Sequence, residues 1–175
     1  TSSGRRGEGE THGRRHGMAY LIDGNNLLGH IAPHELRERS GRDGLVVRLL
    51  AFQRVTRARV HLVFDGNPDV TPTDVAVNPK FTIHFPGAGQ SADDVIRDMV
   101  ARQTDRRRFF VVSSDRAIRE LAKKKGLEAV TSDVFARELK AAIKEGKKRR
   151  ELEKRTEAPT GLEVDLWDEV FRSKP

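Results

Sequence analysis

Short apolar runs alternate with segments of helical periodicity along most of this chain. Apolar runs typical of buried strands occur at residues 18–23, 60–65, 81–85, 109–113 and 128–131. Apolar residues recur at helical spacing in segments 44–57, 91–103, 115–125 and from 132 toward 156, where Ser132 or Asp133 is the expected N-cap. This alternation predicts an α/β fold with a mostly parallel central sheet and helices on both faces, a three-layer α/β/α arrangement.

The remaining segments carry weaker signals. Residues 27–42 are mixed, with Pro33 and Gly41 as expected helix breakers, and residues 69–79 resemble a loop. Residues 1–17 contain almost nothing apolar, which predicts a disordered basic tail. Pro159-Thr160-Gly161 interrupts the chain, and apolar positions after it predict a docking segment or tail over residues 159–175. One domain is therefore expected over residues 18–158, including a basic C-terminal helix.

Composition narrows the choice of partner. The 175 residues carry a net charge of +7, and the pI of about 10 favours polyanionic partners, nucleic acid first. A basic surface kept for solubility is the alternative. The chain has no cysteine, which excludes disulfides, cysteine-based zinc sites and a cysteine nucleophile. With no long apolar stretch and no apolar signal core in the first 17 residues, we expect a cytoplasmic protein without a membrane partner.

Acidic residues stand at the ends of the predicted elements. Asp23 ends the first apolar run and enters a Gly-Asn-Asn turn, and Asp65 ends the second. Asp93 and Asp94 open the helix after the third run, and Asp115 opens the helix after the fourth. The carboxyl ends of parallel strands share one edge of a sheet. A strand order that places the first strand beside the fourth would gather Asp23 and Asp115 at the switch point, where α/β proteins bind ligands. The helix that carries Asp93 and Asp94 could then reach the same crevice.

Clustered carboxylates repel one another unless a proton or a cation separates them. Oxygen-rich sites suit Mg²⁺ or Mn²⁺, which can activate water for attack on a phosphodiester. Each acid also has a structural alternative. Ser91 and Asp94 can form a capping box, Asp115 can cap its helix, and Asp65 can make a turn.

Two polar residues and several basic ones complete the candidate site. Asn26 could bind phosphate, hold Asp23 or simply tolerate a turn, and Ser114 could hold a metal-bound water or cap a helix. We expect RNA contacts from basic residues, with a solvated helix face as the alternative for the last four: Arg116, Lys147, Lys148, Arg149 and Arg150. Arg106-Arg107-Arg108 lies on the edge away from the acids. The six histidines form no zinc-ligand pattern, and His61 and His84 are expected to be structural.

Five short segments of the chain resemble the motifs of a known family and occur in the same order. They are 21–26 (Leu-Ile-Asp-Gly-Asn-Asn), 63–66 (Val-Phe-Asp-Gly), 91–94 (Ser-Ala-Asp-Asp), 112–116 (Val-Ser-Ser-Asp-Arg) and 132–138 (Ser-Asp-Val-Phe-Ala-Arg-Glu). Over roughly residues 18 to 140, the chain resembles the YacP-like branch of the NYN domain family, within the PIN-like ribonucleases. Asn25 departs from the pattern, because many relatives carry tyrosine there.

The resemblance implies a PIN-like fold with a parallel sheet ordered 3-2-1-4-5, and metal-dependent endoribonuclease activity. A member of the branch acts on RNA at the ribosome, so ribosome-associated mRNA or rRNA is an expected substrate. Asp23, Asp93 or Asp94, and Asp115 match the acidic metal positions of the family. Asp65 and Asn26 match supporting positions.

We therefore predict an Mg²⁺- or Mn²⁺-dependent endoribonuclease. Its predicted catalytic residues are Asp23, Asp93, Asp94 and Asp115, with Asp23, Asp94 and Asp115 as metal ligands and Asn26, Asp65 and Ser114 in support. The alternative is a non-catalytic RNA- or ribosome-binding module with a degenerate PIN-like fold, acting through its basic helix. A phosphotransferase with an Asp-x-Asp nucleophile motif is disfavoured, since Asp23-Gly24-Asn25 lacks the second acid. The oligomeric state is left open.

Overall fold

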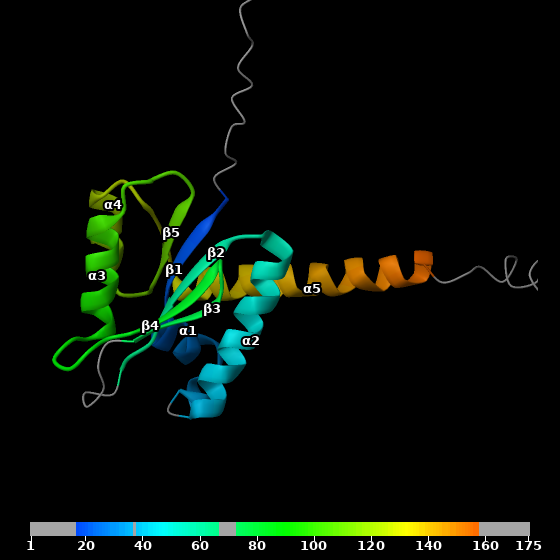
Figure 1. The fold of residues 1–175 in the computed structure, drawn as a ribbon, viewed down its shortest axis with the longest axis horizontal. Helices are drawn as coiled ribbons and strands as arrows, with labels where there is room; N and C mark the ends of the chain where they lie inside the picture. The colour runs from blue at the N-terminus through cyan, green and yellow to red at the C-terminus, as the bar shows by residue number, and fades with distance from the viewer. Residues whose placement is uncertain (1–16, 37, 67–72, 158–175) are drawn as a thin grey trace, which may run out of the picture.

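A twisted sheet forms the middle layer of the computed structural model, which describes residues 17–36, 38–66 and 73–157 (Figure 1). In these residues the sheet has six strands, in the order β3-β4-β2-β1-β5-β6. The strands are β1 (Ala19–Asp23), β2 (Arg59–Val63), β3 (Thr73–Asn78), β4 (Phe81–Phe85), β5 (Phe109–Val112) and β6 (Glu128–Val130). All neighbouring pairs are parallel except β3 and β4.

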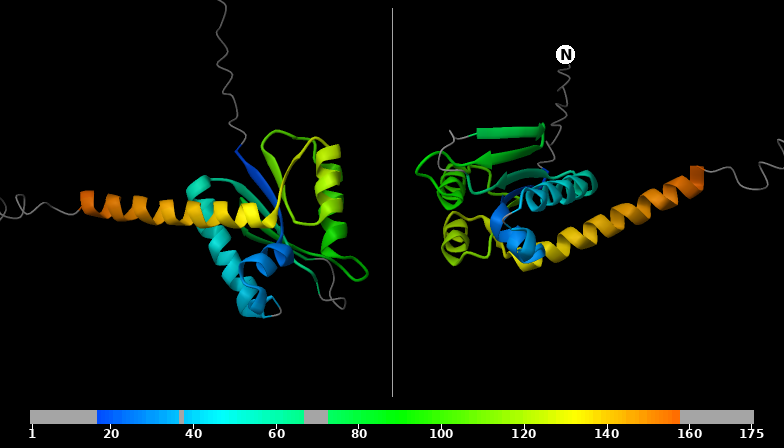
Figure 2. Two further views of the ribbon diagram at one scale, coloured as in Figure 1. Left: turned by 180° about the vertical axis from the view of Figure 1, so that it is seen from behind. Right: turned by 90° about the horizontal axis from the view of Figure 1, so that it is seen from below.

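Helices cover both faces of the sheet (Figure 2). They are α1 (Gly24–Ile31), the short 3-10 helix η1 (Pro33–Glu35), α2 (Arg39–Thr56), α3 (Ala92–Arg102), α4 (Arg116–Lys124) and α5 (Ser132–Glu157). One core contains the apolar faces of α1, α2 and α5, and the other contains those of α3 and α4. The C-terminal part of α5 projects beyond the body of the domain (Figure 1). None of the described helices combines the length and apolar character needed to cross a lipid bilayer.

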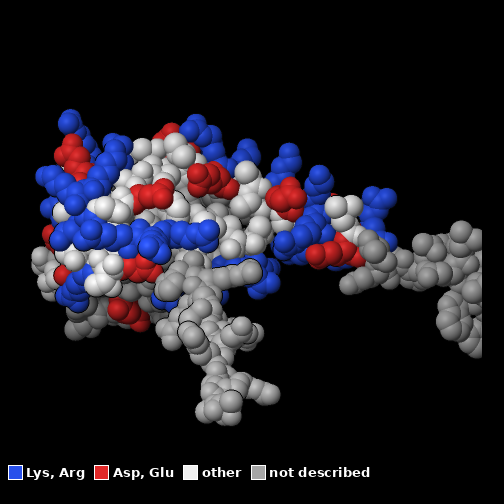
Figure 3. All heavy atoms as spheres, turned by 90° about the horizontal axis from the view of Figure 1, so that it is seen from above, with Lys and Arg blue, Asp and Glu red and all other residues white. Residues whose placement is uncertain are grey.

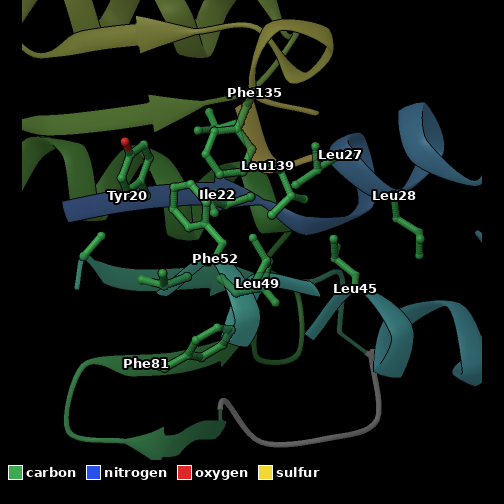
Figure 4. Packing of buried hydrophobic residues seen from close by; sticks show 14 of the residues in the cluster. Tyr20, Ile22, Leu27, Leu28, Leu45, Leu49, Phe52, Phe81, Phe135 and Leu139 are labelled. Atoms are coloured by element: carbon green, nitrogen blue, oxygen red, sulfur yellow. The ribbon is translucent and has the colours of Figure 1, made fainter. Parts of the chain in front are cut away.

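Aromatic rings hold α5 and α2 against the first strand (Figure 4). Tyr20 lies 5.3 Å from Phe52 in an edge-on arrangement, measured between ring centroids, and 5.4 Å from Phe135. Phe52 and Phe135 are also 5.3 Å apart. Pairs of this kind add about 0.5–1.5 kcal/mol each beyond their apolar burial. They pack Phe135, near the start of α5, against Tyr20 in the first half of β1.

The sheet extends from β1 on both sides. Ile22 pairs with Leu62 of β2 on one side and with Val112 of β5 on the other. The first half of the domain therefore builds outward through β2, and the second half through β5. The carboxyl end of β1 lies at the switch point, where the loops of the two halves diverge and where α/β proteins usually bind ligands.

The predicted fold class is confirmed. The strand order differs slightly from the predicted 3-2-1-4-5, because the sheet has a sixth strand at the edge beside the third predicted strand. Residues 73–78 form β3, antiparallel to β4 with Val75 opposite Ile83, where a loop was predicted. Its two valines, Val75 and Val77, lie on either side of Ala76 and are 43% and 39% exposed. An edge strand without a buried face lacks the apolar contrast that distinguishes strands from loops.

Two helix boundaries also differ from the prediction. Gly41 does not end a helix but lies inside α2, where a Cβ atom would collide with the Glu35 carbonyl oxygen. Glycine is needed there for close packing. The mixed segment from residue 27 belongs partly to α1, which begins at Gly24. Because α5 begins at Ser132, neither Ser132 nor Asp133 precedes the helix as its cap. The predicted tail up to residue 16 and the predicted C-terminal segment lie outside the described residues.

Candidate active site

Four carboxylates meet at the carboxyl edge of the sheet. Asp23 ends β1, Asp65 follows β2, Asp93 lies in the first turn of α3, and Asp115 directly precedes α4. Burial raises the pKa of Asp93, and the charges of Asp115, Asp65 and Asp94 raise it further, against Arg97. Asp93 and Asp65 in turn raise the pKa of Asp23. The four charges thus act on one another across segments distant in sequence.

Asp23 is the most buried member of this group, with 7% of its surface exposed. Its carboxylate caps α1 by accepting a hydrogen bond from the Asn26 backbone N–H at 3.1 Å. A second hydrogen bond comes from the Ser113 hydroxyl at 3.2 Å. Burial is the main cause that raises its pKa to about 6, against the effect of these two hydrogen bonds.

Ser113 joins the ends of β1 and β5. Its hydroxyl donates to Asp23 and accepts from the backbone N–H of Asp115 at 3.1 Å. The Asp115 carboxylate caps α4 by accepting from the backbone N–H of Ile118 at 2.9 Å. A single fully buried hydroxyl therefore sets the positions of two of the predicted acids relative to each other.

Asn26 connects the starts of three helices. Its side-chain oxygen accepts from the backbone N–H of Ser114 at 3.0 Å and from the Ser132 hydroxyl at 2.6 Å. The Ser114 hydroxyl accepts from the Ser132 backbone N–H at 3.1 Å. Asn26 and Ser114 thus hold α1, α4 and α5 together behind Asp23. Ser132, at the first turn of α5, was not predicted as a site residue, since no local pattern marks a contact 106 residues away.

Asp93 and Asp94 are adjacent in sequence but have different surroundings in the structure. Asp94 forms a capping box with Ser91: its carboxylate accepts from the Ser91 backbone N–H and hydroxyl, both at 2.9 Å. The Ser91 backbone hydrogen bond is the main cause that lowers the pKa of Asp94. The Asp93 carboxylate has no hydrogen bond to any described residue. The structure therefore brings Asp93 to the other acids and leaves Asp94 in the cap of α3.

Asp65 ties α1 to α3. Its two carboxylate oxygens accept from the side-chain amide of Asn25 at 2.7 Å and from the backbone N–H of Ala92 at 3.3 Å. The side-chain oxygen of Asn25 is buried and has no hydrogen-bond partner among the described residues. Asn25 is therefore a second site residue that sequence reasoning did not select.

The chemistry of these acids suits a hard divalent cation, but their positions do not form a ready metal site. They offer carboxylate oxygens, and their mutual repulsion would be relieved by a divalent ion. In the described part of the chain, however, no three histidine, aspartate or glutamate residues form a group that could hold a metal ion. Asp23, Asp94 and Asp115 all serve as helix caps or capping-box partners.

The predicted RNA-contacting residues lie at two distances from the acids. Arg116 directly follows Asp115, is exposed, and pairs with Glu120 at 2.8 Å. The basic quartet of Lys147, Lys148, Arg149 and Arg150 is exposed on α5, where Arg149 pairs with Glu153 at 3.6 Å. Fifteen helical residues separate Ser132 from Lys147, which corresponds to about 22 Å. The quartet therefore lies far from the candidate site.

Comparison with known proteins identifies a matching family model and similar solved structures. The model of the YacP-like NYN domain matches residues 20–173. The crystal structure of Rae1 (YacP) from Bacillus subtilis is similar, with a TM-score of 0.62 and 23% identity over 89% of this chain and 91% of that chain. A tryptophan-to-leucine mutant of that protein gives a TM-score of 0.64 and 23% identity, over 85% and 89% of the two chains. A search of curated proteins finds no match.

Proposed function

Because the chain belongs to the YacP-like NYN domain family, we propose that it is an endoribonuclease that hydrolyses RNA phosphodiester bonds with Mg²⁺ or Mn²⁺. One observation carries the proposal. A buried aspartate, Asp23, ends the central strand at the switch point. The charges of Asp65 and Asp93 act on it from two other segments, and that of Asp115 acts on Asp93. A set of acids that costs folding free energy in a crevice is typical of a functional site.

The chain's own residues divide into ligands and supports. Asp23, Asp93 and Asp115 would hold the cation, which differs from the sequence-based choice by replacing Asp94 with Asp93. A bound divalent cation supplies a Lewis acid that polarises the phosphodiester and activates water, so no protein nucleophile is required. Ser113 orients Asp23, and Asn26 with Ser114 fixes the loops around it. Arg116, which follows Asp115 directly, would contact a neighbouring phosphate.

The substrate class follows from the family and from charge. A net charge of +7 favours a polyanion, and family membership makes RNA the expected one. We further propose that the substrate is mRNA or rRNA associated with the ribosome. The cytoplasmic location expected from the sequence stays a prediction.

The decisive experiment compares cleavage with and without metal. Purified protein, structured RNA and translating ribosomes are incubated in Mn²⁺, in Mg²⁺ or in EDTA. We expect cleavage in the presence of either metal and none in EDTA. Mn²⁺ should also raise the melting temperature of the protein, because a ligand that binds only the folded state stabilises it. Full cleavage in EDTA would contradict the proposed metal dependence.

A non-catalytic RNA-binding module remains the second candidate, and a specific observation favours it. Helix capping and the contact between Ser113 and Asp23 account for the hydrogen bonds of the Asp23, Asp94 and Asp115 carboxylates. In that case the exposed basic quartet on α5 would carry the function, and RNA would bind without Mn²⁺-stimulated cleavage on any substrate.

Changing the basic quartet to glutamine separates these two functions. We expect RNA affinity to fall by about tenfold or more at low salt, because up to four phosphate contacts are lost. Under the endoribonuclease proposal, kcat at saturating RNA should change little, since the quartet lies far from the acids. As a control, Glu151→Gln with Glu153→Gln on the same helix should strengthen binding. Equal affinity of the quartet variant and the wild type would exclude the quartet from RNA contact.

A further inference from the structure

A basic hollow lies at the opposite edge of the sheet from the acids, where the parallel strands begin. It has a volume of about 360 Å³ and is open to solvent. Its polar lining includes Arg57, Arg59, His61, Lys80, Asp105 and Arg107. Burial lowers the pKa of His61 to about 4, so this histidine is neutral near pH 7. The charge of the hollow therefore comes from three arginines and one lysine against one aspartate.

Backbone hydrogen bonds between neighbouring segments fix the chain around the basic hollow. The backbone N–H of Arg59 donates to the Met18 carbonyl at 2.8 Å, and that of Val60 donates to the Lys80 carbonyl at 2.8 Å. The Ala19 N–H donates to the Arg108 carbonyl at 2.9 Å. Figure 3 looks onto this side of the molecule and shows lysine and arginine side chains gathered on it. The cations are thus presented from strand ends held in register.

The cations of the basic hollow form no ion pair with a described residue. They differ in this from arginines that are neutralised by acids one helical turn away, such as Arg102 with Asp98 at 2.8 Å and Arg116 with Glu120 at 2.8 Å. Arg57, Arg59 and Lys80 are exposed without such a partner. Unpaired cations of one sign around a concave surface raise the local concentration of anions.

Backbone conformation points to the same place. Among the described residues other than glycine, only Arg57 and Arg108 have a positive φ, of 61° and 56°. Arg57 ends α2 in the left-handed conformation that glycine usually supplies at that position. Arg108 immediately follows Arg107 of the hollow lining. Residues other than glycine are uncommon in this conformation, and strained backbone of this kind clusters at functional sites.

We propose that the basic hollow binds the sugar-phosphate backbone of RNA, outside the segment that meets the acids. The inference rests on the proposed function only in taking RNA as the polyanion. The five residues of β1 separate the two edges by about 16 Å. A phosphate held in the basic hollow is therefore not the scissile one, and the contact fixes the position of a larger RNA on the domain.

The test measures binding in EDTA, so that it does not depend on cleavage. A fluorescently labelled structured RNA is titrated with the full chain over a series of salt concentrations. Arg59→Gln is expected to weaken binding about threefold to tenfold and to reduce the salt dependence by about one phosphate contact. Arg57→Gly should also weaken binding while its melting temperature stays at or above that of the wild type, because glycine relieves the left-handed strain. The control, Arg102→Gln, removes an equal charge from a paired arginine and should change affinity by less than about twofold.

The outcomes separate this inference from the proposed function. If Arg59→Gln and Arg57→Gly bind RNA as tightly as Arg102→Gln does, the inference is overturned. It is also overturned if millimolar inorganic phosphate displaces the hollow-dependent part of the binding, because the hollow would then be a small-anion site. A protein that binds RNA through the hollow and never cleaves it would leave the inference standing and contradict the endoribonuclease proposal.

Discussion

Replacing Asp23 with asparagine is expected to abolish RNA cleavage and, at the same time, to stabilise the folded protein. Loss of a central metal ligand removes several kcal/mol of transition-state stabilisation, so cleavage should fall by at least about a thousandfold. RNA binding should persist, since no lysine or arginine side chain is removed. The gain in stability follows from burial, because a neutral amide avoids the desolvation of a carboxylate that is only 7% exposed.

The pH dependence of this gain has a definite sign. The pKa of Asp23 is raised to about 6 in the folded state, whereas the unfolded chain releases the proton at its ordinary value near 4. The stabilising effect of the protonated form is therefore complete below about pH 4 and is lost as the pH rises through about 6. At pH 8 the ionised group costs the wild type about 3 kcal/mol at most, and asparagine should recover about 2 kcal/mol of it.

Thermal melts in EDTA at pH 4 and pH 8 measure the effect. The asparagine variant should melt about 4–8 °C above the wild type at pH 8 and close to it at pH 4. Adding Mn²⁺ should raise the melting temperature of the wild type alone. Asp98→Asn, which changes an exposed aspartate on α3, is the matched control and should alter neither property strongly. Unchanged cleavage by Asp23→Asn would remove Asp23 from the site.

The sequence was sufficient to predict the sheet because its buried strands have continuous apolar runs. Leu21, Ile22, Leu62, Val111 and Val112 are all almost completely buried, and each lies in a predicted strand. The edge strand β3 was missed for the converse reason, since its valines remain exposed. Gly41 was misread because a glycine required by tertiary packing and a glycine that ends a helix are identical in sequence.

The site was predictable as far as it depends on strand ends. Asp23 and Asp65 follow apolar runs, and parallel pairing brings such positions to one edge. The links behind them were not predictable, because Asn26 contacts Ser114 and Ser132 across 88 and 106 residues. The choice between Asp93 and Asp94 depends on direction around a helix, where adjacent side chains point about 100° apart. The sequence did show the possible capping box of Ser91 and Asp94. The hydrogen bonds of this box engage the Asp94 carboxylate, which the sequence analysis had chosen as a metal ligand.

Asparagine substitutions at Asp93 and Asp94 should therefore have opposite effects on activity and stability. Asp93→Asn is expected to reduce cleavage by at least about a hundredfold, since a ligand should matter more than the outer residues that support it. Its melting temperature should not fall, because the Asp93 carboxylate makes no hydrogen bond to a described residue and is repelled by Asp115. Asp94→Asn should keep cleavage within about tenfold of the wild type while lowering the melting temperature, because the cap of α3 loses its carboxylate.

The two variants are chemically identical changes at neighbouring positions, so each serves as the control for the other. Cleavage rates at saturating Mn²⁺ and melts in EDTA give the two readings independently. Ser91→Ala should reproduce the stability loss of Asp94→Asn without affecting cleavage, because it removes the other half of the same capping box. If Asp94→Asn abolishes cleavage while Ser91→Ala does not, then Asp94 leaves its cap to bind the metal and the assignment of Asp93 is wrong.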